Sequence, residues 1–204
     1  MTDGVPIPVF DVGNVLIRWD PRRLFRELIA EETALDEFLA KVCHHDWNLE
    51  QDRGRSFAEG VAERIALFPD QAHLIRAYDE RWVETLGGAI EGSVAILDEL
   101  RAKGVPTYAI TNFSREKFAL TRELYPFLDG FDGIIVSAHE GLIKPDPRIY
   151  ALLCERYGLA PRHCVFIDDN LANVEGARAF GMQAHHFQEP EVLRAELKEA
   201  GLPL

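Results

Sequence analysis

Short apolar segments that alternate with amphipathic helices constrain the fold of this chain more than any other feature of its sequence. The apolar segments predict buried strands at residues 7–11, 105–110, 133–136, 164–167 and 182–187. Apolar residues at three-to-four spacing predict helices over residues 92–103, 114–124, 147–157, about 170–177 and 190–200. Strands that alternate with helices in this way form parallel sheets. The predicted fold class is therefore α/β, a Rossmann-like three-layer sandwich with a parallel sheet covered on both faces.

The residues after the first strand interrupt this alternation. Asp20 followed by Pro21 is typical of a helix N-terminus. Segments with helical spacing then predict four helices, at residues 22–30, 34–42, 56–68 and 71–86. Four helices with short connections favour a small bundle. We therefore expect two parts, a Rossmann-like part from residues 1–14 and 89–204 and an inserted helical bundle from residues 15–88.

Composition and charge narrow the range of partners. The chain has 204 residues and a formal net charge of −12, so an acidic surface would repel nucleic acid and anionic membranes. No apolar run is long enough to span a bilayer, and the N-terminus lacks the features of a signal peptide. The cysteines, Cys43, Cys154 and Cys164, form no CxxC pair. We expect a cytoplasmic protein, monomeric or homodimeric, that binds neither nucleic acid nor membrane.

Polar residues stand at the ends of the predicted strands or in the loops that follow them. They are Asp11, Thr111, Asn112, Lys144, Asp168 and Asp169. The carboxyl ends of parallel strands meet at one edge of a sheet, where ligands of open α/β folds bind. Carboxylates can hold Mg²⁺, a lysine and a hydroxyl can hold phosphate oxygens, and a carboxylate can attack phosphorus to form an aspartyl-phosphate. Together these residue types indicate a phosphoryl-transfer site.

Four sequence motifs add a family resemblance that covers essentially the whole chain. In order along the chain they read FDVGNV, AITNFS, GLIKPDPRIY and VFIDDNLANVEGARAFGM. They resemble motifs I to IV of the haloacid-dehalogenase-like hydrolases, and the helical insert after motif I matches the cap of the branch with a four-helix cap. Within that branch the FDVGNV wording is similar to that of the α-D-glucose-1-phosphate phosphatases. The resemblance implies that the inserted bundle is a cap that closes over the site.

The resemblance also implies a role for each matching residue. Asp11 matches the nucleophile, and Lys144 the lysine that pairs with the nucleophile and the phosphate. Thr111 and Asn112 match the residues that bind the phosphoryl group. The implied ligands of Mg²⁺, the expected cofactor, are Asp11, the Gly13 main-chain carbonyl and Asp169, with Asp168 and Asn173 behind them. The implied partner is a small phosphorylated metabolite such as a sugar phosphate.

Gly13 departs from the pattern of most phosphatases in the family, which carry a second aspartate at this position. That aspartate protonates the leaving group and later activates water. Glycine permits close backbone approach, but it supplies no acid or base, a group typically worth about 10²–10⁴ in rate. Three accounts remain open: an Mg²⁺-dependent phosphatase whose substrate, cap or water supplies the proton; a 2-haloacid dehalogenase that uses Asp11 as nucleophile; and a weakly active phosphate-binding protein.

The polar segment from residue 44 to residue 54 is the part of the cap that we expect to contact the substrate beyond its phosphate. We interpret it as a connection between two helices, and a His or Asp within it could supply the missing proton, with His44, His45 and Asp46 the first to consider. Trp19 and Phe113 could wall the pocket. For a dehalogenase, an arginine early in the cap would bind the substrate carboxylate, and the nearest candidates are Arg26 and Arg53.

Overall fold

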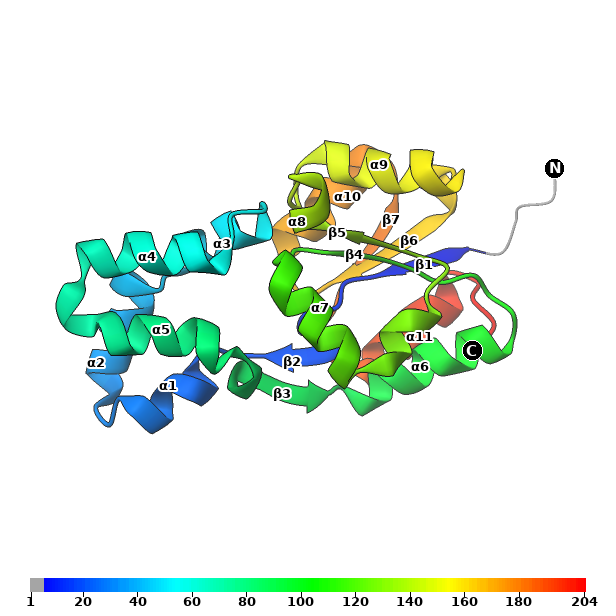
Figure 1. Ribbon diagram of the computed structural model, residues 1–204. Helices are drawn as coiled ribbons and strands as arrows, with labels where there is room; N and C mark the ends of the chain where they lie inside the picture. Colours follow the sequence, from blue (N-terminus) through cyan, green and yellow to red (C-terminus); the bar gives the residue numbers. More distant parts are fainter. Residues whose placement is uncertain (1–5) are drawn as a thin grey trace.

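A five-stranded parallel sheet forms the centre of the larger part of the molecule (Figure 1). The computed structural model describes residues 6–204, so residues 1–5 of the predicted Rossmann-like part lie outside the described residues. The strand order is β5-β4-β1-β6-β7. The strands are β1 (Ile7–Phe10), β4 (Tyr108–Thr111), β5 (Gly133–Val136), β6 (Cys164–Asp168) and β7 (Gln183–His186). Because β1 lies at the centre, the polar residues after β1, β4 and β6 are neighbours.

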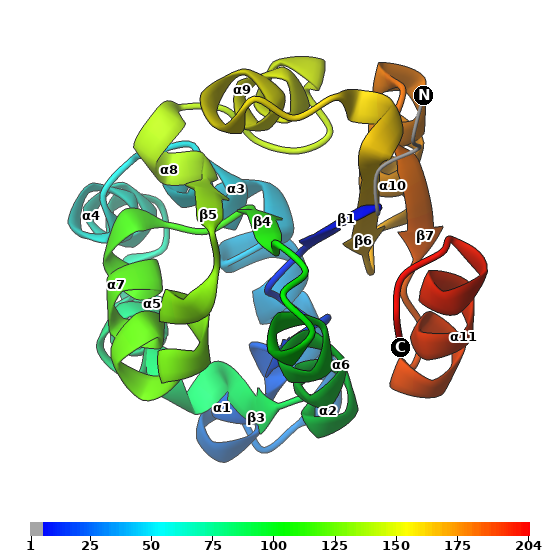
Figure 2. The ribbon, with the colours of Figure 1, turned by 90° about the vertical axis from the view of Figure 1, so that its right-hand side faces the viewer.

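Helices cover both faces of this sheet (Figure 2). The helices of this part are α6 (Glu91–Ala102), α7 (Arg115–Leu124), α8 (Ser137–Glu140), α9 (Pro147–Tyr157), α10 (Leu171–Phe180) and α11 (Pro190–Glu199). Successive side chains of β1 point to opposite faces, so Phe10 packs with α6 and α11 while Val9 packs with α9 and α10. The predicted three-layer α/β sandwich is confirmed.

The strand around residue 108 begins later than the sequence predicts. We expected a strand over residues 105–110, and β4 begins at Tyr108. Pro106 has no N–H to donate to a neighbouring strand. The amide N–H of Thr107 is used outside the sheet, since it donates to the side chain of Asp132 at 2.8 Å. Ladder pairing therefore starts only after both residues.

The smaller part contains one more α-helix than the sequence predicts. Its helices are α1 (Arg22–Leu28), α2 (Glu32–Glu37), α3 (His45–Asp52), α4 (Phe57–Leu67) and α5 (Ala72–Glu80), with a π-helix at Phe38–Val42. The interpretation of residues 44–54 as a polar connection is wrong, because α3 occupies most of it. His44 caps this helix by accepting a hydrogen bond from the Trp47 amide at 3.2 Å. Trp47 and Gln51, four residues apart, bury the opposite side of the helix.

Two short strands that the sequence did not predict connect the parts. β2 (Ile17–Trp19) and β3 (Leu86–Ala89) pair antiparallel, so the chain enters and leaves the helical part side by side. Gly87 is required here because a Cβ atom at this position would lie 2.8 Å from the Cβ of Arg18. Ile17 already belongs to the hydrophobic core under the large sheet. Short 3₁₀ turns complete the elements, at Pro69–Gln71, Trp82–Thr85, Pro126–Gly130 and Pro161–His163.

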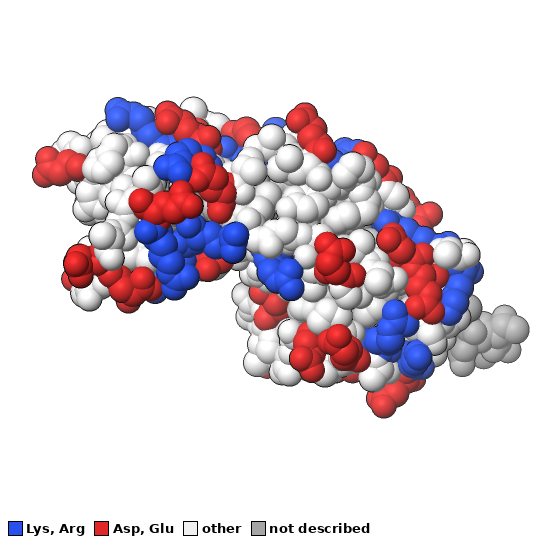
Figure 3. Space-filling model, turned by 90° about the horizontal axis from the view of Figure 1, so that it is seen from below, with Lys and Arg blue, Asp and Glu red and all other residues white. Residues whose placement is uncertain are grey.

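Acidic and basic side chains are interspersed over the face seen from below (Figure 3). Several exposed ion pairs lie on the surface of the molecule, such as Arg122 with Asp129 and Arg81 with Glu84. Such exposed pairs contribute little to stability. Within residues 6–204, no helix combines the length and the apolar character that crossing a bilayer requires.

Candidate active site

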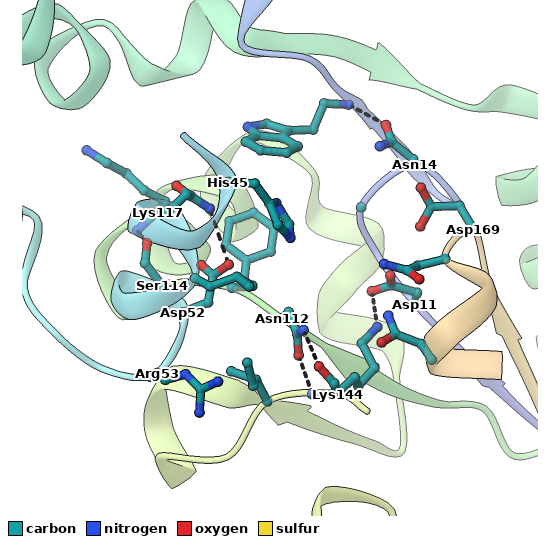
Figure 4. A pocket seen from close by; sticks show the side chains of 18 of the residues that line it. Asp11, Asn14, His45, Asp52, Arg53, Asn112, Ser114, Lys117, Lys144 and Asp169 are labelled. Carbon is teal, nitrogen blue, oxygen red and sulfur yellow. Dashed lines mark hydrogen bonds and ion pairs between the residues drawn. The ribbon is translucent and has the colours of Figure 1, made fainter. Parts of the chain in front are cut away.

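A pocket of about 400 Å³ lies where the carboxyl edge of the sheet faces the helical part (Figure 4). Asp11 comes directly after β1 and Asp169 directly after β6, so both reach the pocket from neighbouring strands. The opposite wall comes from α3, with His45, Asn48 and Asp52. The volume is in the usual range for small-molecule sites, roughly 300–1,000 Å³.

The larger part of the molecule provides one wall of the pocket, which we call the core wall. Lys144 is at its centre. Its side chain is fully buried, and Nζ donates to Asp11 Oδ1 at 2.9 Å, to Asp168 Oδ2 at 2.6 Å and to the Ile110 carbonyl at 3.0 Å. Burial favours the neutral amine, but the charges of Asp11 and Asp168 outweigh it and raise the pKa of Lys144. All three ammonium hydrogens are therefore used to hold protein oxygens, including an oxygen of the predicted nucleophile.

Asp168 is held by hydrogen bonds on both carboxylate oxygens. Oδ1 accepts from the Asn170 amide at 2.8 Å and from Asn173 Nδ2 at 3.0 Å. Oδ2 accepts from Lys144 and, at 3.1 Å, from Asn173 Nδ2. The Tyr150 hydroxyl donates to the Asn173 carbonyl at 2.8 Å and so anchors this residue in turn. Asp168 is thus saturated by protein donors and fixes Lys144.

Asn112 holds the loop that carries Lys144. Its Nδ2 donates to the Lys144 carbonyl at 3.1 Å, and its Oδ1 accepts from the Lys144 amide at 2.8 Å. Gly176 in α10 allows this loop to lie close, because a Cβ atom there would sit 2.8 Å from the Pro145 side chain and 3.1 Å from its carbonyl oxygen. The side-chain amide of Asn112 is therefore already hydrogen-bonded to the main chain of Lys144.

Thr111 occupies the last position of β4 and is 1% exposed. Its Oγ1 has no hydrogen-bond partner within residues 6–204, which is unusual for a buried hydroxyl. The residue lies behind the pocket wall rather than on it. The structure therefore does not bring this predicted phosphate-binding hydroxyl to the surface of the pocket.

Asp11 and Asp169 form the part of the site that could hold a cation. With Asp168, each offers a carboxylate oxygen within 4.8 Å of the others. Burial raises the pKa of Asp11 to about 8, although Lys144 opposes the shift. Burial and then the charge of Asp168 raise the pKa of Asp169. A bound divalent cation would favour the ionised form of both groups, and oxygen donors of this kind fit Mg²⁺.

The surroundings of Gly13 are open. A Cβ atom built on Gly13 meets no atom within 4 Å, and Gly13 does not have a positive φ. The left-handed residue of this turn is Asn14, with φ of 53°, and its Oδ1 accepts from the Trp19 amide at 2.9 Å. No protein neighbour within residues 6–204 therefore makes use of the close approach that glycine permits at this position. A Cβ atom would therefore fit at position 13 without displacing a neighbour.

Some of the cap residues that the sequence suggested for the site line the pocket, and others do not. His45 lines the pocket, whereas His44 caps α3 and Asp46 is not among the lining residues. Arg53 also lines the pocket, whereas Arg26 pairs with Glu32 at 3.2 Å outside it. Trp19 and Phe113 both contribute to the wall, as the sequence suggested.

The sequence analysis did not single out the side chain of Asp52. It is 8% exposed, and burial raises its pKa to about 7, with Lys144 and the Ser114 backbone opposing the shift. The missed signal is the spacing of His45, Asn48, Leu49 and Asp52, which is i, i+3, i+4 and i+7 and therefore one helix face. His186 is a second side chain beside the site, since its Nε2 lies 2.9 Å from the Asp169 carbonyl oxygen.

The doubly wound parallel sheet and the acidic site at its carboxyl edge agree with the similarity of this chain to a known family of hydrolases. The haloacid dehalogenase-like hydrolase family matches residues 8–181. The chain belongs to this family and is a hydrolase.

Three relatives show the range of this similarity. The sesquiterpene phosphatase astK of Aspergillus oryzae is 26% identical over 194 residues, which is 94% of each chain. The (S)-2-haloacid dehalogenase 1 of Pseudomonas sp. (strain CBS-3) is 29% identical over 122 residues, 60% of this chain and 50% of the relative. The crystal structure of the HAD family enzyme bt-2542 from Bacteroides thetaiotaomicron, in complex with magnesium and inorganic phosphate, shares the fold. Its TM-score is 0.71 at 22% identity, over 91% of this chain and 95% of that one.

Proposed function

We propose that the protein is an Mg²⁺-dependent phosphatase that hydrolyses a small phosphate monoester through an aspartyl-phosphate on Asp11. The observation that carries the proposal is the bond from the buried Lys144 to one oxygen of Asp11, beside the second acid Asp169. A fixed lysine positions one carboxylate oxygen and leaves the other to attack phosphorus. The similarity to a phosphatase over nearly the full length of both chains supports this chemistry.

In this proposal each residue of the core wall has a defined task. Asp11, the Gly13 carbonyl and Asp169 would hold Mg²⁺, which neutralises charge between the anionic nucleophile and the anionic ester. Lys144 orients Asp11, and Asp168 with Asn173 orients Lys144. The Thr111 hydroxyl, which has no protein partner within residues 6–204, would donate to a phosphoryl oxygen only if its side chain turned toward the pocket. Asn112 acts on the phosphate indirectly, since its side chain holds the Lys144 loop.

The helical part supplies the other half of the site. We propose that residues 1–14 and 89–204 form the catalytic core and that residues 15–88 form the cap. The pocket contains apolar groups from both sides, and these could contact the organic part of the ester. They are Trp19, Leu49, Phe57, Trp82, Phe113 and Ile143. A sugar phosphate, as the motif resemblance implies, and an isoprenoid phosphate, as the full-length relative suggests, are the two substrate classes to compare first.

A 2-haloacid dehalogenase is the second candidate, and one observation favours it. Arg53 lies in the pocket and could bind the carboxylate of a haloacid, and Gly13 supplies no proton, which a halide does not need. A close cluster of three acids argues for a metal-dependent reaction instead. The two activities differ in their need for a metal, and that difference is measurable.

The test is a screen against sugar, isoprenoid and aryl phosphates, with and without a chelator, and with 2-chloropropionate as control. We expect phosphate release that stops with chelator and returns when Mg²⁺ is added. Halide release from 2-chloropropionate in the presence of chelator, without phosphatase activity, would overturn the proposal in favour of the dehalogenase.

A further inference from the structure

The core wall of the pocket offers no free side chain that could donate a proton to the leaving group. Asp168 has both oxygens occupied and Lys144 has all three ammonium hydrogens occupied. Asp11 and Asp169 are committed to the nucleophile and the metal in the proposed function. Position 13 offers open space and no side chain. Lys117 of α7 also lines the pocket, but it is paired with Asp79. We therefore look for the proton donor in the cap.

The cap wall is one face of α3 that points at the core wall (Figure 4). His45 and Asp52 lie at the two ends of α3 and both line the pocket. They are the titratable side chains of the cap that could transfer a proton. His45 is exposed, whereas Asp52 is buried at the junction of the cap with α7. Burial fixes a carboxyl group in one orientation and separates it from bulk water.

Asp52 has few partners for a buried carboxyl group. Asn48 Nδ2 donates to its Oδ2 over a long distance of 3.3 Å, and the Ser114 backbone provides a second hydrogen bond. Cations lining the same pocket do not form an ion pair with it within the described residues. Arg53 bonds with Glu50 at 3.4 Å, Lys117 with Asp79, and Lys144 with the acids of the core wall. The carboxyl group thus remains available to a ligand.

We propose that Asp52 is the general acid and base of the reaction and performs from the cap the task that Gly13 cannot perform. This inference rests on the proposed phosphatase function. The pKa of about 7 that burial imposes on Asp52 supports it, because both protonation states are then populated near neutral pH. A free carboxyl group would be almost fully ionised there.

The proton transfers balance over the two steps. In the first step an Asp11 oxygen bonds to phosphorus, the bond from phosphorus to the leaving oxygen breaks, and that oxygen takes the Asp52 proton directly or through one water. Asp52 is then a carboxylate. In the second step it removes a proton from water, whose oxygen bonds to phosphorus while the bond to Asp11 breaks. Phosphate leaves, Asp11 is restored as a carboxylate and Asp52 is protonated again.

The experiment compares two leaving groups in Asp52→Asn, which keeps the size of the side chain. With Mg²⁺, we expect kcat for an alkyl phosphate to fall by about 10²-fold or more, the usual value of a general acid. The leaving group of 4-nitrophenyl phosphate needs no proton, so the rate of the bond-breaking step should change much less for this ester. The release of nitrophenol in the first turnover measures that rate. Asp70→Asn is the matched control, because Asp70 is an exposed cap acid outside the pocket. It should leave both rates unchanged.

A rescue sharpens the test, since a Cβ atom at position 13 meets no neighbour within 4 Å. In the Asp52→Asn background, Gly13→Asp should restore alkyl phosphatase activity and Gly13→Asn should not. Equal losses for both esters in the bond-breaking step would mean that Asp52 only anchors α3 against α7, and would overturn the proposal. So would a loss confined to alkyl esters in His45→Gln but absent from Asp52→Asn. A wild type that hydrolyses neither ester with Mg²⁺ refutes the phosphatase itself, which is a separate result.

Discussion

The two walls of the pocket are built on different principles. On the core wall, the side chains of Lys144 and Asp168 use their bonding capacity on one another and on their neighbours, so one geometry is fixed. On the cap wall, Asp52 has a long bond to Asn48 and one backbone bond, and His45 is exposed. A saturated network suits a reaction centre that must not move. A sparsely bonded wall suits groups that exchange protons or adapt to a substrate.

The comparison predicts its largest effect at Asp11, on the core wall. Asp11→Asn replaces the nucleophile by an amide of the same size, so turnover should fall on the order of 10⁶-fold, as when other covalent hydrolases lose their nucleophile. The thermal unfolding midpoint should remain close to that of the wild type. Steady-state phosphate release and calorimetry measure both quantities. Substantial turnover in this variant would contradict covalent catalysis at Asp11.

Lys144→Met should give the second largest effect, and it should affect both activity and stability. It removes the cation between Asp11 and Asp168 but keeps the length of the side chain. We expect kcat to fall about 10²–10³-fold, and the free energy of unfolding to fall by roughly 3–5 kcal/mol because buried acids lose their partner. Urea denaturation at pH 7 measures the second value. A variant as stable as the wild type would show that the core wall is not the saturated network described above.

Asp52→Asn should have the opposite effect on stability. Burial raises the pKa of Asp52 from 3.8 to about 7, so the folded state favours the protonated form. The stability that this group contributes is complete below about pH 4 and is lost as the pH rises through 7, a difference of about 4 kcal/mol. The charged or titratable groups lining the same pocket are Asp11, His45, Arg53, Lys117, Lys144 and Asp169.

The amide of the variant does not titrate, so its own burial cost is the same at every pH and cancels from a comparison between two pH values. Urea denaturation should therefore show the variant gaining on the wild type by roughly 2.5 kcal/mol between pH 5 and pH 8. The same difference between the two proteins at both values would contradict the shifted pKa.

Asn173→Ala should have the smallest effect of the set. It removes the donor to both oxygens of Asp168 but leaves Lys144 and the acids in place. Losses of this kind behind a metal site usually cost about 10–100-fold in metal affinity or activity. The Mg²⁺ concentration for half-maximal activity and kcat should be measured together. No change in either would remove Asn173 from the account.

The core wall could be predicted from the sequence because short motifs carry it. Asp11, Lys144 and the acid pair each follow a strand with a clear apolar pattern, and parallel strands necessarily bring their carboxyl ends together. The bonding of Asn112 to the Lys144 main chain could not be predicted. It depends on how two loops from different crossovers meet.

The cap wall was harder to predict because its helix lacks an apolar stripe of ordinary width. In α3 the buried face is carried largely by Trp47 and Gln51, and a polar face lines the pocket. A segment that is polar on most sides resembles a loop when only apolar periodicity is considered. The strands β2 and β3 were missed for a related reason, since they are short and Gly87-Gly88 is typical of a turn.

Acid quench after rapid mixing tests the central claim most directly. The wild type and Asp52→Asn are mixed with 4-nitrophenyl phosphate and Mg²⁺, and both nitrophenol and protein-bound phosphate are measured. We predict that Asp52→Asn releases one nitrophenol per enzyme in a burst and carries the phosphoryl group on Asp11, since the first step needs no acid and the second lacks its base. The wild type should accumulate less of this intermediate. The absence of a burst and of phosphate on Asp11 in both proteins, while turnover continues, would contradict the account.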